Sequence, residues 1–181
     1  RHLEEVRINN RGAIYFSAHL ANWELVPAAA AVVGVPATIL FRAPLSEDIA
    51  AGLGRLRATP LHRFVDSDRG AAFDLATALE RGEHIGVMMD LKWPGVTLPF
   101  LGRPASNNPI VGRLARRFDV PIYGVRVVRR PSSHFLLEVT EPLDLPRDGE
   151  GRVDADGATA AVNAVIEGWV RERPEDWFWV Y

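Results

Sequence analysis

The stretch that decides the fold is the apolar run Ala13-Ile14-Tyr15-Phe16-Ser17-Ala18, which continues directly as His19-Leu20-Ala21-Asn22-Trp23-Glu24. The apolar run is typical of a strand. Pro27 follows soon after, and proline is tolerated in a helix only in its first turn. We therefore expect the strand to end near Ala18 and a helix to begin near Trp23. This arrangement places His19 on the connecting turn and Glu24 in the first helical turn.

The rest of the chain alternates between strand-like and helix-like segments. Apolar runs typical of strands lie at Ala37–Phe41, His84–Met89, Pro121–Val128 and Phe135–Val139. Helical spacing is found at Ser46–Ala58, Arg69–Arg81, Asn108–Phe118 and Asp156–Arg171. The second and third runs are almost continuously apolar, which predicts central strands. The pattern predicts an α/β fold with a mixed central sheet flanked by helices.

Two finer expectations follow from the same patterns. In the Arg69–Arg81 helix, the residues expected to form one apolar stripe are Ala72, Phe73, Ala76 and Leu79. The segments Leu91–Pro109 and Asp144–Asp156 are rich in turn-forming residues, and we expect both to be loops. Neither has the composition of an interdomain linker, so the 181 residues are interpreted as one domain.

Composition excludes several classes of function. The formal net charge is -2, and no basic block with interleaved aromatic residues is present, which argues against nucleic-acid binding. There are no cysteines, so thiolate metal sites and a cysteine nucleophile are excluded. The longest apolar run, Leu25–Ala37, contains Pro27, Gly34 and Pro36 and is too short to span a bilayer. The histidines show no metal-ligand spacing, and we expect neither a metal nor a cofactor.

The H-x-x-x-x-E pattern of His19 and Glu24 is the strongest chemical signal in the sequence. On a single helix, a separation of five residues at about 100° each would put the two side chains on different faces. A strand-to-helix turn, in contrast, lets the chain fold back so that the side chain of Glu24 approaches that of His19. A carboxylate bonded to one imidazole nitrogen fixes the tautomer and supports the charge of a general base. The spacing alone is also compatible with a structural histidine held by a carboxylate at a turn, since such pairs occur in structural networks too.

Several blocks of the chain resemble one family. His19-Leu20-Ala21-Asn22-Trp23-Glu24-Leu25 is similar to the H-x4-E block of bacterial lysophospholipid acyltransferases, in particular the late acyltransferases of lipid A biosynthesis. Further similar blocks are Phe41-Arg42-Ala43-Pro44, Gly86-Val87-Met88-Met89-Asp90, Val96–Ala105, Ala115–Ile122 and Arg173–Trp179. The sequence departs from the family at Leu91, where Gln is usual, and after Pro44, where Asn is frequent.

The resemblance implies a fold like that of glycerol-3-phosphate acyltransferases and transfer of an acyl group from acyl-carrier protein or acyl-CoA to a lipid hydroxyl. It implies His19 and Glu24 as a catalytic dyad, and a location on the cytoplasmic face of the bacterial inner membrane. It also implies that the chain is a fragment that lacks an N-terminal membrane anchor and a C-terminal tail. The acceptor is expected to be a lipid A precursor; another glycolipid, a lysophospholipid, or a lipid-binding module without turnover are the alternatives.

Other residues are candidates for binding rather than chemistry. The expected substrate-binding residues are Asn22, Arg42, Asp90 and Arg129. Arg42 could hold a phosphate or form a surface ion pair with Glu47 or Asp48, and Asp90 could line the site or cap the turn that follows it. The cluster Arg113, Arg116 and Arg117 could dock an acidic carrier protein. The tryptophans at 169, 177 and 179 are expected to be core or membrane-facing residues.

Overall fold

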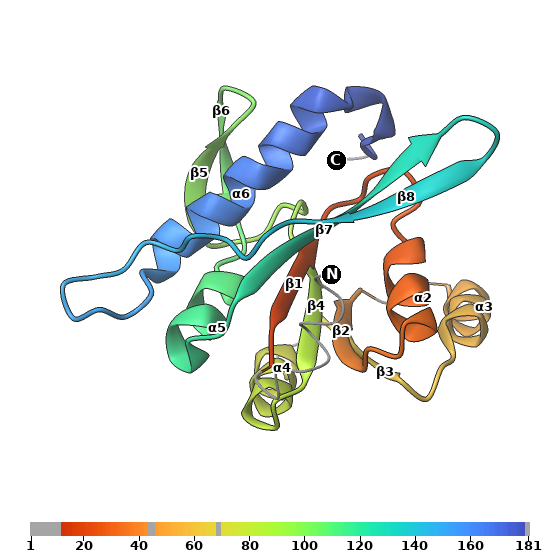
Figure 1. Cartoon of the computed structure of the whole chain (residues 1–181), viewed down its shortest axis with the longest axis horizontal. Coiled ribbons are helices and arrows are strands. Elements are labelled where there is room, and N and C mark those ends of the chain that lie inside the picture. Colours follow the sequence, from red (N-terminus) through yellow and green to blue (C-terminus); the bar gives the residue numbers. More distant parts are fainter. Residues whose placement is uncertain (1–11, 43–45, 68–69, 180–181) are drawn as a thin grey trace.

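The computed structural model describes residues 12–42, 46–67 and 70–179 of the chain (Figure 1). The strands are β1 (Ile14–Ser17), β2 (Ala37–Phe41), β3 (His62–Asp66), β4 (His84–Met88), β5 (Val96–Phe100), β6 (Arg103–Asn107), β7 (Ile122–Arg130) and β8 (His134–Val139). The helices are α2 (Leu25–Val32), α3 (Glu47–Arg57), α4 (Ala71–Glu80), α5 (Ile110–Phe118) and α6 (Ala155–Glu172), followed by a short 3-10 turn, η1 (Pro174–Asp176).

Six strands form one mixed sheet in the order β3-β2-β4-β1-β7-β8. β3, β2, β4, β1 and β7 pair in parallel, and β8 returns antiparallel along β7. Long apolar runs favour inner positions because such strands are covered on both faces. β4 and β7 do lie inside the sheet, on either side of β1, as their sequences predict. The predicted α/β class with a mixed central sheet is confirmed.

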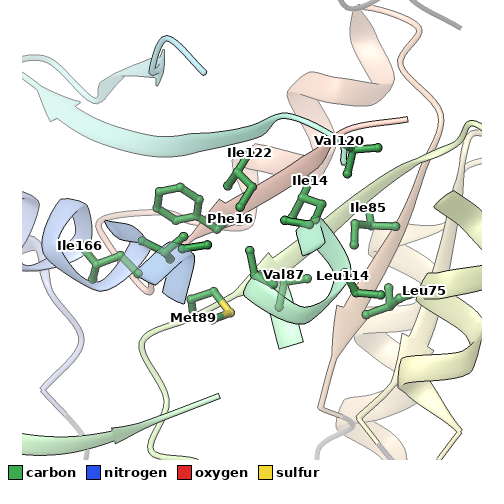
Figure 2. Close-up of a cluster of buried hydrophobic side chains, with 14 of the residues drawn as sticks. Ile14, Phe16, Leu75, Ile85, Val87, Met89, Leu114, Val120, Ile122 and Ile166 are labelled. Carbon is green, nitrogen blue, oxygen red and sulfur yellow. The ribbon is translucent and has the colours of Figure 1, made fainter. Parts of the chain in front are cut away.

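Helices cover both faces of this sheet, and α5 and α6 lie on the opposite side from α2 and α3 (Figure 1). The side chains of Ile14 and Phe16 on β1 and of Ile85 and Val87 on β4 point to the α4–α5–α6 side. They are at most 4% exposed and meet the apolar faces of those helices, as Figure 2 shows. This layer is the hydrophobic core of the molecule.

Two segments differ from the sequence-based expectations. Leu91–Pro109 is not a loop throughout, because β5 and β6 form an antiparallel hairpin within it. Pro99 and Pro104 face one another in that hairpin, and both residues of its turn, Leu101 and Gly102, have positive φ. Proline has no backbone N–H to donate, and both strands of a two-stranded ribbon are edge strands, where proline is tolerated. For this reason two strands contain residues that are typical of loops. β3 was also not predicted; it is a short edge strand with little apolar signal.

The predicted apolar stripe of α4 is partly wrong. Phe73 is 76% exposed, and Ala72 also faces solvent. The buried face is formed by Ala71, Leu75, Ala76, Ala78 and Leu79. Positions i, i+4 and i+8 (Ala71, Leu75, Leu79) satisfy helical spacing as well as the predicted set does, and the direction in which the helix packs on the sheet decides between them. The ends of the other predicted helices and strands lie within about two residues of their predicted positions.

Candidate active site

His19 and Asp90 meet at the carboxyl edge of the sheet. β1 and β4 are parallel neighbours, and their register aligns Ser17 with Met88. The backbone continues for two residues beyond that pair in each case, from β1 to His19 and from β4 to Asp90. The His19 ring nitrogen Nδ1 lies 2.7 Å from Asp90 Oδ1. Loops at the carboxyl edge of parallel strands are where α/β proteins place their ligand sites.

The Asp90 carboxylate is buried and held by three donors. Its side chain is 2% exposed, and besides the His19 ring it accepts hydrogen bonds from the His19 backbone N–H (2.8 Å) and from Trp177 Nε1 (3.0 Å). Burial raises the pKa of Asp90, but the hydrogen bonds and charge of His19 and the bond from Trp177 together lower the pKa below its ordinary value. Asp90 is therefore ionised at neutral pH, and Nδ1 of His19 must carry the proton in the bond between them.

This arrangement leaves the other nitrogen of His19 available. Nε2 has no hydrogen-bond partner among the residues that the structure describes, and the side chain is 17% exposed. With Nδ1 protonated, Nε2 carries the lone pair of the neutral ring. Such a nitrogen can take a proton from a hydroxyl group, while the buried carboxylate supports the charge that the ring gains.

Glu24 is not the carboxylate that holds His19, and that prediction is wrong. The Glu24 oxygens accept from Nε and a terminal nitrogen of Arg57, at 2.9 and 2.5 Å. The guanidinium of Arg57 in turn lies over the rings of Phe41 and Phe64. α2 begins at Leu25, near the predicted position, with Glu24 as its N-cap residue. Glu24 follows His19 by five residues and lies in the same region, but its carboxylate forms a bidentate ion pair with Arg57 instead of a bond to His19. A catalytic role of Glu24 stays a prediction.

A cavity of about 560 Å³ extends from His19 beneath α2. Its walls come from the sheet face opposite the core, including Tyr15, Ile39 and Gly86, and from the inner side of α2, including Pro27 and Ala30. Residues along the whole of β2 line it, so the cavity follows that strand for roughly 13 Å. Its lining is predominantly apolar apart from His19, Glu24 and a few side chains near the carboxyl edge.

The cavity exists because α2 stands away from the sheet. None of the eight residues of α2 is buried, although the helix is apolar throughout. In the sheet below, the central residue of β4 is Gly86, which has no side chain to extend into the cavity. A Cβ there would meet only Ile39, at 3.4 Å or more, which is ordinary van der Waals contact. No close contact thus requires this glycine, and its effect is to keep the cavity wide.

Of the predicted binding residues, Arg42 and Asp90 lie at the site. Arg42 is exposed and lines the cavity, as does Lys92 in the loop after Asp90. Asn22 is half-buried in the turn before α2 but is not among the residues that line the cavity. Arg129 is exposed beyond the carboxyl edge of the sheet, on the β7–β8 hairpin, with its guanidinium over the ring of Phe135. Arg42 and Lys92 therefore place positive charge at the cavity, whereas Asn22 and Arg129 are not among its lining residues.

The arginines of α5 lie away from this site. Arg116 binds Asp148 and the Val153 carbonyl, and Arg117 pairs with Glu80 at the end of α4. α4 ends shortly before β4 begins, so these arginines lie at the amino edge of the parallel strands. His19 lies at the carboxyl edge. The structure therefore does not bring the predicted docking cluster close to His19.

Two residues at the site, Arg57 and Trp177, are not among the site residues predicted from the sequence. Arg57 lies at the end of α3, and Trp177 lies beyond α6, directly after η1. An isolated antiparallel bridge joins Trp177 to Leu20 in the loop that bears His19. Trp169 is a core residue as predicted, stacked on Phe16. No local pattern could have paired Arg57 or Trp177 with its carboxylate.

The described residues contain no group of three or more histidine, aspartate or glutamate side chains placed to hold a metal ion. None of their helices combines the length and the apolar character needed to cross a membrane.

Comparison with known proteins identifies the family. The family model of bacterial lipid A biosynthesis acyltransferases matches residues 1–181, which is the full length of the chain. No curated protein matches it. An acyltransferase of this kind needs an acyl donor and a lipid acceptor, and a histidine beside an apolar cavity is consistent with both. The chain belongs to the bacterial lipid A biosynthesis acyltransferase family.

Proposed function

We propose that this acyltransferase moves a fatty acyl group from the thioester of acyl-carrier protein or acyl-CoA to a hydroxyl of a lipid A precursor, with His19 as the general base. The observation that carries the proposal is the position of His19. Its Nδ1 is bonded to a buried carboxylate, and the same side chain lines a predominantly apolar cavity of about 560 Å³. This volume lies within the usual range of ligand sites.

The proposed reaction uses this geometry in three steps. Nε2 of His19 takes the proton of the acceptor hydroxyl as the oxygen attacks the thioester carbonyl carbon. The resulting tetrahedral intermediate collapses and breaks the bond from carbon to sulfur. The imidazolium then returns the proton from Nε2 to the departing thiolate. Throughout, Nδ1–H remains bonded to Asp90, whose negative charge stabilises the imidazolium.

Asp90 is the orienting carboxylate in this proposal, and Glu24 has a different part. Glu24 and Arg57 join the start of α2 to the end of α3, and both side chains line the cavity. The pair thus holds the helix that forms one wall. The guanidinium of Arg42 and the ammonium of Lys92 are the charges available to bind phosphates, on the donor or on the acceptor.

The apolar cavity is the proposed site of the donor's acyl chain. Its lining residues come from α2 and from the sheet face that the core leaves free. An acyl chain that lies along β2 would contact these apolar walls with its methylene groups and place its thioester carbonyl near His19. Apolar burial contributes roughly 0.8 kcal/mol per buried CH₂ group, which favours a long acyl chain over a short one.

We also propose that the enzyme works at the cytoplasmic face of the inner membrane. Trp93 lines the cavity and is 37% exposed, and the exposed ring of Phe178 contacts Trp23, which lines it too. Aromatic side chains of this kind favour the interface between lipid and water. Vesicle binding by the full-length protein that weakens in Trp93→Ser would support this docking; unchanged binding would count against it.

The reaction can be followed by the thiol that it releases. The full-length protein is mixed with an acyl-CoA or acyl-carrier donor and with a lipid A precursor. Released thiol and the acylated lipid are then measured in parallel, the lipid by mass spectrometry. We expect the two products in equal amounts. Thiol release without acylated lipid would mean hydrolysis, and no product from any lipid acceptor would contradict the proposal.

A further inference from the structure

The segment after α6 closes over the loop that bears His19. The backbone N–H of Ala21 donates to the Asp176 carbonyl (2.7 Å), and the N–H of Phe178 donates to the His19 carbonyl (3.0 Å). Leu20 and Trp177 form a bridge between these two bonds. Residues separated by more than 150 positions in sequence are thus tied together at the reacting histidine.

Trp177 makes the contact with the site. Its Nε1 donates to Asp90 Oδ2 at 3.0 Å, while the other oxygen, Oδ1, accepts from the His19 ring. The indole is kept in place by the rings of Phe100 and Trp179, with centroids at 5.6 and 4.6 Å. The carboxylate is therefore held at both oxygens: one by the base that it serves, and one by the indole and the His19 backbone.

We propose that Trp177 is a positioning residue for acyl transfer, fixing the Asp90 carboxylate in the plane from which it orients His19. The inference rests on the proposed function of His19. A carboxylate with a donor missing at Oδ2 can turn about its terminal torsion, which is soft in aspartate. Turning moves Oδ1 away from Nδ1, and the imidazole loses the orientation that directs Nε2 into the cavity.

The neighbouring Trp179 offers a matched control. Its Nε1 also donates to an acceptor at an ordinary distance, but that acceptor is the Pro174 carbonyl, at 2.8 Å. The two tryptophans lie in one segment and touch each other. Trp177→Phe and Trp179→Phe therefore each remove one indole N–H and keep an aromatic ring. Only the first variant alters a partner of Asp90.

The test compares these variants in the full-length enzyme. We expect Trp177→Phe to lower kcat roughly 10- to 100-fold, the effect of losing a hydrogen bond to a charged group, with little change in KM for the donor. Trp179→Phe should leave kcat within about 2-fold of the wild type. Proton NMR gives an independent reading, since the Nδ1–H signal of His19 should shift in Trp177→Phe and not in Trp179→Phe.

A double mutant separates positioning from packing. In an Asp90→Asn background, Trp177→Phe should add little further loss, because the carboxylate that it positions has already been removed. A full additional loss would overturn the inference, as would equal kcat in the two tryptophan variants. If Trp177→Phe does not fold, benzothienylalanine at 177 keeps the shape of the indole with sulfur in place of N–H. The same fall in kcat is then expected, and unchanged kcat would refute the role.

The two proposals fail differently. If the wild type transfers acyl groups, His19→Ala does not, and Trp177→Phe matches Trp179→Phe, only the positioning role is lost. If the wild type transfers no acyl group to any lipid, the proposed function is lost, and the NMR signal still reports whether Trp177 sets the geometry of His19 and Asp90.

Discussion

The two faces of the central sheet are built for different purposes, and two glycines show the contrast. On the core face, a Cβ added to Gly124 would lie 2.8 Å from the Phe16 ring and 2.9 Å from that of Trp169, so packing leaves no room there for a side chain. On the opposite face, a Cβ added to Gly86 would make only ordinary contact with Ile39. The first glycine is required by what the core contains. The second keeps space open for what the cavity is to hold.

The same contrast extends to the covering helices. α4, α5 and α6 each contribute four or more buried residues to the core side, whereas α2 contributes none to the other side. Dense packing stabilises a fold, and a cavity reduces that stabilisation. We therefore expect substitutions on the core face to change stability and substitutions on the cavity face to change activity.

The largest effect on this comparison should come from His19, the proposed base. His19→Ala is expected to lower kcat roughly 10²- to 10⁴-fold, the usual contribution of positioned proton transfer, with little change in melting temperature. Turnover and thermal melting should be measured on the same preparations. A well-folded His19→Ala enzyme with near-normal turnover would exclude the mechanism.

The two carboxylates near the base can be ranked in the same assay. Asp90 binds the imidazole and Glu24 binds Arg57, so Asp90→Asn should lower kcat more than Glu24→Gln. The double variant of His19→Ala and Asp90→Asn should be little worse than His19→Ala alone, because an orienting carboxylate has no effect without its imidazole. The reverse ranking would favour Glu24 as the partner of the base.

An intermediate effect is expected from the two glycines, taken as a matched pair. Gly124→Val forces a side chain against Phe16 and Trp169 and should lower the free energy of unfolding by about 1–3 kcal/mol or more. Gly86→Val should leave stability nearly unchanged and shift donor preference toward shorter acyl chains. Thermal melting and rates with a series of acyl-CoA lengths distinguish the two variants. Unaltered chain-length preference in Gly86→Val would show that the acyl chain lies elsewhere.

The smallest effect concerns a buried hydroxyl beside the cavity. Tyr15 Oη is buried without a hydrogen-bond partner in the described structure, and burial raises the pKa of this phenol above its ordinary value. Its ring stacks on that of Tyr123, and a phenylalanine keeps that contact. Tyr15→Phe should therefore raise the free energy of unfolding by about 1 kcal/mol, since a buried unsatisfied group is removed. A fall in stability would mean that the hydroxyl has a partner in solution.

Local patterns predicted most of the parallel sheet. Continuous apolar runs identified β4 and β7 as inner strands, and Pro27 located the start of α2. The same reasoning failed at the β5–β6 hairpin, where prolines tolerated in a two-stranded ribbon resemble a loop. It also failed for Phe73, which was predicted to be buried on the apolar face of α4 and is exposed. Helical spacing is compatible with several buried faces, and the packing of neighbouring elements decides which face is buried.

The sequence by itself determined that His19 lies on a turn after an apolar strand and that Asp90 ends another. It also determined that the chain contains no cysteine to act as nucleophile. Only the tertiary structure decided that Asp90, rather than Glu24, is bonded to His19. The reason is that β1 and β4 lie side by side in a register that no local pattern encodes, and Arg57 and Trp177 reach the two carboxylates from distant parts of the chain. Sequence spacing shows which residues can meet; the order of strands in the sheet selects the ones that do.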